Sequence, residues 1–285
     1  MGAPHGGCQS LRWVLELRGR ARNLWWTGEL AGAKGCDVVS EVKIQFLGSG
    51  DAFASGGRLQ ACIHVEAGSA GFLLDCGATT LYAMKRLGVH PPSIDAILLT
   101  HLHGDHFGGI PFLLLEAQLV SKRERPLTIL GPPTTAERVR KAMEALFPGS
   151  SEMEFRFPVE YVEFADRQPI DWGEVRATPY PVVHGSGAPP YALRVECAGK
   201  VIAYSGDTEW TDGLVEAARH ADLFICEAYS YDKKMKFHID IATLMDHRQE
   251  IQCRRLVLTH MSEDVLGRVS GMDVETAEDG KRIVL

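Results

Sequence analysis

Apolar and polar residues alternate over residues 42–47 (VKIQFL), which predicts a strand with one buried face. It ends at G-S-G, residues 48–50, a combination typical of a turn. Shorter apolar runs predict further strands, several of them buried on both faces. These strands cover residues 61–66, 71–75, 94–100, 127–130, 159–164, 174–180, 191–196, 201–205, 223–226, 256–259 and 281–285. His64 falls on an alternating strand, where we expect it at the surface.

Helix-like spacing of apolar residues occupies several intervals between these strands. Expected helices cover residues 79–87, 110–122, 134–147, 212–220 and 239–251. Gly88 ends the first helix, and Thr134 with Glu137 forms a capping-box pattern at the start of the third. Asp212 is a candidate cap for the fourth helix. Paired strands followed by strand–helix units predict an α/β protein with helices layered on one or two sheets.

The first 42 residues do not share this pattern, because a Gly/Pro-rich start leads into arginines interleaved with tryptophan and leucine. Glu16 and the arginines interrupt the apolar core that a signal peptide needs. The acidic residues and the scarcity of serine disfavour an organelle transit peptide. We expect a poorly ordered N-terminal extension at residues 1–42, with a short docked helix as the alternative, and one domain over residues 43–285.

Composition narrows the classes of protein that fit. Of 285 residues, 45% are hydrophobic and 24% charged, as in a globular enzyme. The 30 basic and 37 acidic residues give a formal net charge of −7, which disfavours a broad nucleic-acid platform. No apolar run approaches the ~18–20 residues of a membrane span. Seven cysteines without a C-x-x-C pair disfavour a disulfide scaffold or zinc ribbon, and free thiols favour a cytoplasmic location.

Candidate chemistry concentrates in the segment T-H-L-H-G-D-H-F-G-G at residues 100–109, between a predicted buried strand and a helix. Three imidazoles and a carboxylate share this short loop: His101, His103, Asp105 and His106. Protonated imidazoles so close together would repel one another unless a cation organises them. Neutral imidazole and ionised carboxylate are the usual zinc donors, and one zinc takes about four ligands. The loop could therefore serve one metal, or two with ligands from elsewhere.

Three further donors follow predicted strands: His184, Asp207 and His260. Each alone is explained as well by a capping role or by a satisfied polar contact. Together they would supply the missing ligands, because open α/β sheets place their sites at the ends of strands. Asp75 also ends a buried strand, and we expect it to contact a ligand histidine such as His101.

With these residues the chain resembles the metallo-β-lactamase-fold hydrolases over residues 43–285. The matching features are the H-x-H-x-D-H loop, the later histidine, the S-G-D-T aspartate and the T-H histidine. The resemblance implies a four-layer αββα sandwich with two divalent metal ions, zinc or alternatively manganese, in a cleft at one edge. The implied metal sites are His101 with His103 and His184, and Asp105 with His106 and His260, bridged by Asp207.

Narrower features resemble the ribonuclease Z and phosphodiesterase branch. F-L-G-S-G at residues 46–50 is similar to its F-L-G-x-G opening, and F-I-C-E-A-Y at residues 224–229 resembles its H-E-A-T segment with Cys226 replacing the histidine. His238 stands where the branch has a histidine near the scissile phosphate. Ribonuclease Z also has a long tRNA-gripping arm between the ligands that match His184 and Asp207. Here that interval is 207 − 184 = 23 residues, which disfavours long RNA as a partner.

The function predicted from these features is a binuclear metal-dependent phosphodiesterase for small phosphodiesters or cyclic phosphates, using a metal-bridging hydroxide as nucleophile. Its expected partner is a small anionic substrate and not a membrane. A homodimer is an alternative to a monomer that the sequence does not decide. We expect Asp105 and Asp207 to act at the metals. His238, held by Glu227, would protonate the leaving alkoxide. The following helix would lower the pKa of His238, and Glu227 would offset this.

Three alternatives remain: a ribonuclease Z-like endonuclease on RNA ends, a hydrolase of esters, thioesters or lactams, and a metal-binding sensory module without catalysis. Salt-dependent competition by single-stranded RNA would favour the first. Turnover of thioesters but not of bis-(p-nitrophenyl) phosphate would favour the second. Metal binding without turnover of any ester class would favour the third. Lys233, Lys234 and Lys236 form either a solvated loop or a basic cluster that attracts an anionic substrate.

Overall fold

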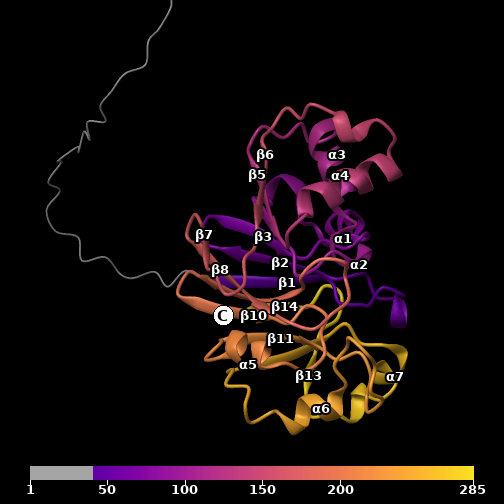
Figure 1. Cartoon of the computed structure of the whole chain (residues 1–285), viewed down its shortest axis with the longest axis vertical. Helices are drawn as coiled ribbons and strands as arrows, with labels where there is room; N and C mark the ends of the chain where they lie inside the picture. The colour runs from indigo at the N-terminus through magenta and orange to yellow at the C-terminus, as the bar shows by residue number, and fades with distance from the viewer. Residues whose placement is uncertain (1–40) are drawn as a thin grey trace, which may run out of the picture. The chain divides into compact units, whose positions relative to one another are not determined.

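The computed structural model describes residues 41–285, which form two mixed seven-stranded β-sheets (Figure 1). The predicted extension at residues 1–42 lies outside the described residues, apart from its last two positions. The first sheet is antiparallel from β14 to β3 and parallel from β3 to β6. In spatial order its strands are β14 (Arg282–Val284), β1 (Val42–Gly48), β2 (Cys62–Ala67), β3 (Ala70–Leu74), β4 (Ala96–Leu98), β5 (Leu127–Gly131) and β6 (Val159–Glu163).

The second sheet has the same division, parallel from β13 to β10 and antiparallel from β10 to β7. In spatial order its strands are β13 (Glu275–Thr276), β12 (Leu256–Thr259), β11 (Leu223–Glu227), β10 (Lys200–Tyr204), β9 (Tyr191–Cys197), β8 (Val175–Pro181) and β7 (Ile170–Trp172). Strands β7 and β13 were not predicted, because they span only three and two residues, too few for a pattern to emerge.

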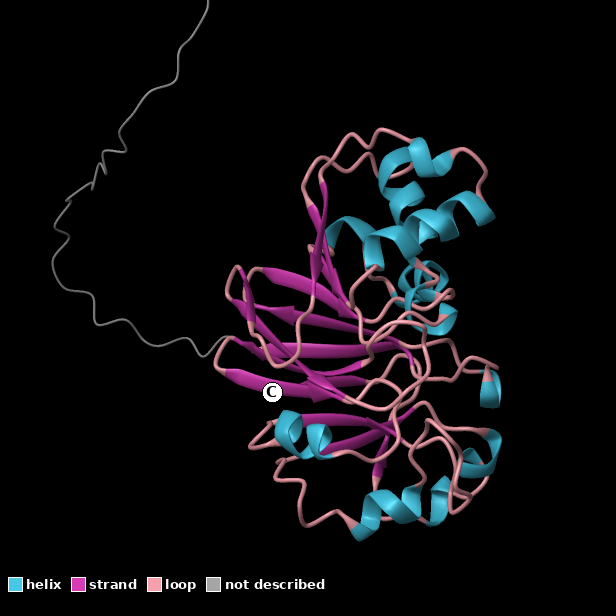
Figure 2. Ribbon diagram, in the orientation of Figure 1, coloured by secondary structure: helices cyan, strands magenta, loops and turns pink. Residues whose placement is uncertain are grey.

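Helices cover the outer face of each sheet (Figure 2). Those packed on the first sheet are α1 (Thr80–Leu87), α3 (Ile110–Leu119) and α4 (Thr135–Leu146), with α2 (Gly104–Phe107) beside them. Those on the second are α5 (Asp212–Ala218), α6 (Ile241–Asp246) and α7 (Glu263–Leu266). Short 3-10 turns are Ser55–Gly57, Pro91–Ser93, Ser150–Glu152 and Val269–Gly271. Among the described residues, no helix is both long and apolar enough to cross a bilayer.

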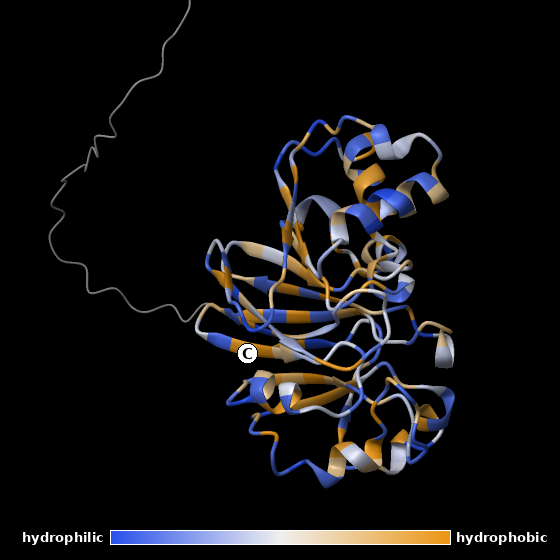
Figure 3. Cartoon of the chain, viewed as in Figure 1, coloured by the Kyte–Doolittle hydropathy of each residue, from blue (hydrophilic) through white to orange (hydrophobic). Residues whose placement is uncertain are grey.

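The hydrophobic core has three parts that separate four layers. Between the sheets, Phe46 and Phe72 of the first share a cluster with Tyr191 and Ile225 of the second. A second cluster joins the first sheet to its helices, and a third joins the other sheet to α5, α6 and α7. Hydrophobic positions accordingly recur along the strands of both sheets (Figure 3). The order helix, sheet, sheet, helix confirms the predicted αββα sandwich.

Three local predictions are wrong. Asp212 does not cap α5 but is its first residue, because the chain enters the helix one position earlier, with Thr211 at the N-cap. Thr134 does not form a capping box, because its backbone is left-handed (φ 74°) and its side chain makes no capping bond, while Glu137 pairs with Lys141. The Thr134 amide instead donates to the Glu163 carboxylate. His64 is not at the surface but 4% exposed, because the residues that follow α1 cover this face of β2.

The fold brings the ends of separate strands to one edge, where the candidate residues lie. Asp75 follows β3, and the 100–109 loop follows β4 of the same sheet. In the second sheet, His184 follows β8, Asp207 follows β10 and His260 follows β12. The two sheets meet closely there: Gly206 has φ 56°, and a Cβ at this position would come within 2.7 Å of Thr100. A glycine is therefore needed before Asp207 for the loops to approach.

Candidate metal centre

The 100–109 loop holds its four polar residues largely inside the protein. The buried strand β4 ends at Leu98, and α2 begins at Gly104 after His103, whose backbone is extended. His101 and His106 are fully buried, and Asp105 is 7% exposed. A buried polar group is costly unless it finds partners, so the surroundings of these side chains decide what the loop can do.

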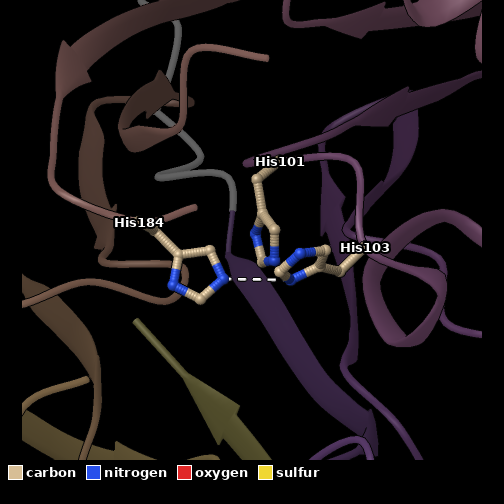
Figure 4. Close-up of side chains that lie close together, drawn as sticks. All are labelled: His101, His103 and His184. Atoms are coloured by element: carbon tan, nitrogen blue, oxygen red, sulfur yellow. Dashed lines mark hydrogen bonds between the residues drawn. The ribbon is translucent and has the colours of Figure 1, made fainter. Parts of the chain in front are cut away.

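His101, His103 and His184 form one cluster, in which one ligand atom from each lies within 4.8 Å of the others. Figure 4 shows the three imidazoles turned toward one another across the two sheets. His103 Nδ1 and His184 Nε2 are 3.0 Å apart, and the rings of His101 and His184 are 4.6 Å apart. Nitrogen lone pairs at such distances repel unless a proton or a cation lies between them.

Asp105, His106, Asp207 and His260 form a second cluster, and all four are buried. His260 Nε2 lies 3.4 Å from Asp105 Oδ2, and His106 Nε2 lies 3.3 Å from Asp207 Oδ1. Asp207 Oδ2 is also 3.9 Å from the Nε2 atoms of His101 and of His184. One carboxylate thus faces both clusters.

The donor set fits divalent cations. Among the described residues, His101 Nε2, His106 Nε2 and Asp207 Oδ1 are buried without a hydrogen-bond partner. Buried polar atoms are rarely left so, and these three lie within 4 Å of another donor of the clusters, where a cation would satisfy them; His260 Nδ1 is also without a partner. Burial, and then the neighbouring His106, hold the pKa of His101 well below its usual range, so the imidazole is neutral, the form that binds metal.

Asp207 is ionised in this setting. Burial raises the pKa of its carboxyl group, but His106 and His260 outweigh burial and hold the pKa well below its usual range. An ionised carboxylate between two imidazole groups is a ligand suited to bridging cations.

Outer hydrogen bonds orient the ligand candidates of the loop. Asp75 Oδ2 lies 2.7 Å from His106 Nδ1, and Asp75 also accepts from the amide and the hydroxyl of Thr100. His101 Nδ1 lies 3.0 Å from the Thr100 hydroxyl. The predicted contact between Asp75 and a ligand histidine therefore goes to His106 directly and reaches His101 only through Thr100.

Two backbone carbonyls orient the other imidazoles. Phe237 O lies 2.9 Å from His184 Nδ1, and Gly185 O lies 3.1 Å from His103 Nε2. Neither contact is predictable from the sequence, because every residue has a carbonyl and residue type gives no signal of its use. The contact between Thr100 and His101 was not predicted either, although Thr100 directly precedes His101 in the sequence.

His238 and Glu227 lie beside both clusters. His238 Nδ1 is 3.0 Å from Glu227 Oε2, and Glu227 is fully buried. The His238 ring stacks on Tyr229 at 4.6 Å and lies 5.2 Å from the His184 ring. Burial lowers the pKa of His238, but Glu227 outweighs this and the net shift is upward, whereas we expected the helix to lower it. Helix α6 begins only at Ile241. Its N-terminal amide of Thr243 donates to the Asp240 side chain and not to His238.

The interval between His184 and Asp207 contains β9 and β10, which pair as an antiparallel hairpin. Nothing within this interval extends into an arm, in keeping with its 23-residue length. In the nearby lysine cluster, Lys234 pairs with Asp240, and the Lys236 ammonium lies 4.6 Å from the centre of the Phe237 ring. Lys233 is exposed.

Comparison with known proteins assigns the class. Human tRNase Z, short form, superposes with a TM-score of 0.68 and 28% identity, over 85% of this chain and 98% of that one. The metallo-beta-lactamase fold protein YhfI of Bacillus subtilis gives a TM-score of 0.69 and 21% identity, over 86% and 100%. Ribonuclease Z of Mycobacterium bovis is 29% identical over 193 residues, 65% of this chain and 69% of that protein. The fold and the site thus define a metallo-β-lactamase-fold hydrolase of the ribonuclease Z and phosphodiesterase branch.

A family model identifies the protein more closely. The model described as "Anti-Pycsar protein Apyc1" matches residues 42–275, which is 234 of 285 positions and includes every candidate ligand. The chain therefore belongs to the Apyc1 family, and the predicted resemblance to this branch of hydrolases is confirmed.

Proposed function

We propose that this chain is a two-metal phosphodiesterase that acts on small phosphodiesters or cyclic phosphates. The observation that carries the proposal is the placement of His238 on buried Glu227, next to both His/Asp clusters. Hydrolysis of a phosphodiester needs a nucleophile, neutralisation of charge on the phosphoryl oxygens, and a proton for the departing alkoxide. Cations held by the two clusters would activate the nucleophile and neutralise the charge on the phosphoryl oxygens. His238 would supply the proton.

The metals are held by the seven clustered side chains. We assign His101, His103 and His184 to one cation, Asp105, His106 and His260 to the other, and Asp207 to both. Zinc fits this nitrogen and oxygen donor set, and manganese is the alternative. When bound, two such cations lower the pKa of a shared water and offset negative charge on the phosphoryl group. Asp105 and Asp207 would supply the negative charge that holds the cations at this site.

His238 donates the proton that the leaving alkoxide requires. Glu227 accepts from Nδ1, which keeps the opposite nitrogen, Nε2, available to carry the transferred proton. The His238 side chain is 20% exposed, so a bound substrate can reach it. Thr208 donates its amide to the other oxygen of Glu227, which fixes the carboxylate against the imidazole.

The substrate class follows from what borders the site. The short hairpin between His184 and Asp207 offers no surface to grip a folded RNA, and the net charge of −7 weakens long-range attraction of a polyanion. The nearby exposed Lys233 and Lys236 are enough to attract a small anion.

A ribonuclease Z-like endonuclease is the second candidate, favoured by one observation: the 29% identity to a ribonuclease Z over 193 residues. It predicts cleavage at the end of an RNA, with strong dependence on salt. Cleavage of a precursor RNA faster than of cyclic mononucleotides would select it over the small-substrate phosphodiesterase.

The test is a substrate panel on protein loaded with a defined metal. Cyclic mononucleotides, linear dinucleotides, bis-(p-nitrophenyl) phosphate, thioesters and a precursor tRNA are compared for kcat/KM. We expect the small phosphodiesters to be turned over and the thioesters not. His238→Ala should keep both metals yet lose most turnover of substrates with poor leaving groups, while His90→Ala, an exposed histidine, serves as the matched control. Full activity of the His238→Ala protein would contradict the proton-donor role.

A further inference from the structure

Three consecutive residues after β10 contact the loops that carry the other groups of the site. The carboxylate of Asp207 faces both clusters. Thr208 donates its amide to Glu227, and its hydroxyl accepts from the amide of Val183 at 3.0 Å. The Glu209 amide donates to the carbonyl of Val183, also at 3.0 Å. Thr208 and Glu209 thus bond to the amide and to the carbonyl of Val183, the residue that precedes His184.

The side chain of Glu209 makes one further contact, which the proposed mechanism does not use. Its Oε1 accepts from the amide of Phe237 at 2.8 Å. Phe237 has a φ of 71°, in the left-handed region that a bulky residue rarely adopts without outside contacts. Its ring lies beside Gly185, where a Cβ would come within 3.0 Å of it. The carboxylate and this close packing together hold Phe237 in that conformation.

Phe237 in turn fixes the proton of a candidate ligand. Its carbonyl oxygen lies 2.9 Å from His184 Nδ1. A carbonyl can only accept, so the proton of His184 is on Nδ1 and the lone pair of Nε2 faces His103, 3.0 Å away. Phe237 also directly precedes His238, so its backbone angles aim that residue toward Glu227.

We infer that Glu209 is a positioning residue that prepares His184 to bind a cation, by holding the Phe237 carbonyl against His184 Nδ1. The inference rests on the metal centre assigned under the proposed function, but not on the substrate. Glu209 is not a ligand and contacts no reacting atom; it acts through one amide and one carbonyl of a neighbouring loop. Its effect is confined to the cation held by His101, His103 and His184, because the other cluster has no described contact with Phe237.

The experiment compares Glu209→Ala, Glu209→Gln and Glu209→Asp with an exposed control, Glu174→Ala. Zinc is titrated into the metal-free full chain against a competing chelator, so that two binding steps are resolved. Long-range ¹H–¹⁵N correlation spectra report which nitrogen of His184 carries the proton. Thermal unfolding of the metal-free proteins shows whether each variant is folded.

We expect Glu209→Ala to weaken one zinc by roughly 10–100-fold, the usual effect of losing a group that orients a metal ligand, and to leave the other zinc unchanged. The Nδ1-proton signal of His184 should weaken in parallel. Glu209→Gln keeps an acceptor oxygen at the same reach and should restore affinity to within a few-fold, although a neutral acceptor bonds less strongly than a carboxylate. Glu209→Asp keeps the charge but is one methylene shorter, so it should resemble Glu209→Ala.

Wild-type affinity for both zinc ions in Glu209→Ala, with an unchanged His184 signal, would overturn the inference. If Glu209→Ala does not fold, the other two variants decide: weaker zinc in Glu209→Gln than in Glu209→Asp would mean that charge, not the bond to Phe237, matters, and would also overturn it. Failure to hydrolyse any phosphodiester would remove the proposed substrate class and leave these affinities as the separate test.

Discussion

The two halves of the proposed metal centre differ in what surrounds their imidazoles. In the three-histidine half (His101, His103 and His184), the outer nitrogens face a hydroxyl and two backbone carbonyls, all neutral acceptors. In the carboxylate half (Asp105, His106 and His260), His106 faces Asp75, and Asp105 and Asp207 lie within 3.4 Å of the histidines. The pKa values diverge accordingly. Burial lowers the pKa of His184, whereas in His260 the carboxylates overcome burial and raise the pKa to about 9.

This difference indicates how each half binds a cation. The carboxylate half holds two carboxylates, so we expect Coulomb attraction to give it the stronger affinity once its histidines release their protons. The three-histidine half has neutral ligands drawn from both sheets, so its affinity depends on the position of loops, above all the loop of Phe237. Asp207 belongs to both halves. We therefore expect its loss to weaken the binding of both cations.

The largest effect is expected from Asp207→Ala. The substitution removes the carboxylate that lies within 4 Å of four of the five clustered imidazoles, so both cations should bind poorly. Turnover should fall by at least ~10²–10³-fold, the scale of losing one electrostatic stabiliser of the transition state. Metal content by mass spectrometry and kcat on a phosphodiester are measured together, with Asp246→Asn, an exposed aspartate, as the control. Retention of one cation with full turnover would show that the halves are independent.

Removal of the cations should destabilise the chain next most strongly. A ligand present at about 1,000 times its Kd stabilises the folded state by about 4 kcal/mol, which corresponds to roughly 8–16 °C in Tm for a protein of this size. Calorimetry over increasing chelator concentrations should show two steps. The comparison of the halves requires that the three-histidine half loses its cation first; a single step, or the reverse order, would contradict it.

Asp75→Asn acts directly on the carboxylate half and reaches His101 only through Thr100. Asn keeps the shape and tolerates the left-handed backbone found at residue 75 (φ 58°), but it is a weaker acceptor for His106 Nδ1. Affinity for the cation of that half should fall by roughly 10–100-fold. Thr100→Val removes the hydroxyl beside His101, which also donates to Asp75, and keeps the Asp75 charge; only a few-fold loss is expected from it in either half. Equal losses of cation affinity in both variants would show that the charge of Asp75 does not account for the difference between the two halves.

Alternation and buried runs were enough to predict most strands and an α/β protein with helices layered on one or two sheets, because they report which face of each element is covered; the four-layer order was implied by the resemblance to a known family. Element ends were less predictable: the strand expected at residues 94–100 spans only Ala96–Leu98 in β4, and the helix expected at 239–251 is only Ile241–Asp246. The capping box at Thr134 failed because the chain turns there through a left-handed residue, which is set by contact with Glu163 from a distant strand.

The candidate ligands could be found because they combine a telling residue type with a place at a strand end. The residues that orient them could not. Asp75 was recognised as a supporting residue but given the wrong histidine, since the choice between His101 and His106 depends on ring orientation. The carbonyls of Phe237 and Gly185 have no sequence signature at all, and Glu209 gains its role only through a loop 28 positions away.

The smallest effect is expected from the exposed lysines beside the three-histidine half. Lys233→Ala with Lys236→Ala should raise KM for an anionic substrate by roughly 2–5-fold, because exposed charges contribute about 1 kcal/mol or less in water. The increase should shrink as salt rises, since screening already weakens the attraction. Lys43→Ala, on the exposed side of β1, is the control. Both cation affinities and kcat should stay as in the wild type, because Lys236 rests on the Phe237 ring and touches no candidate ligand. An unchanged KM at low salt would assign these lysines to a solvated loop and leave the cations as the main attraction for the substrate.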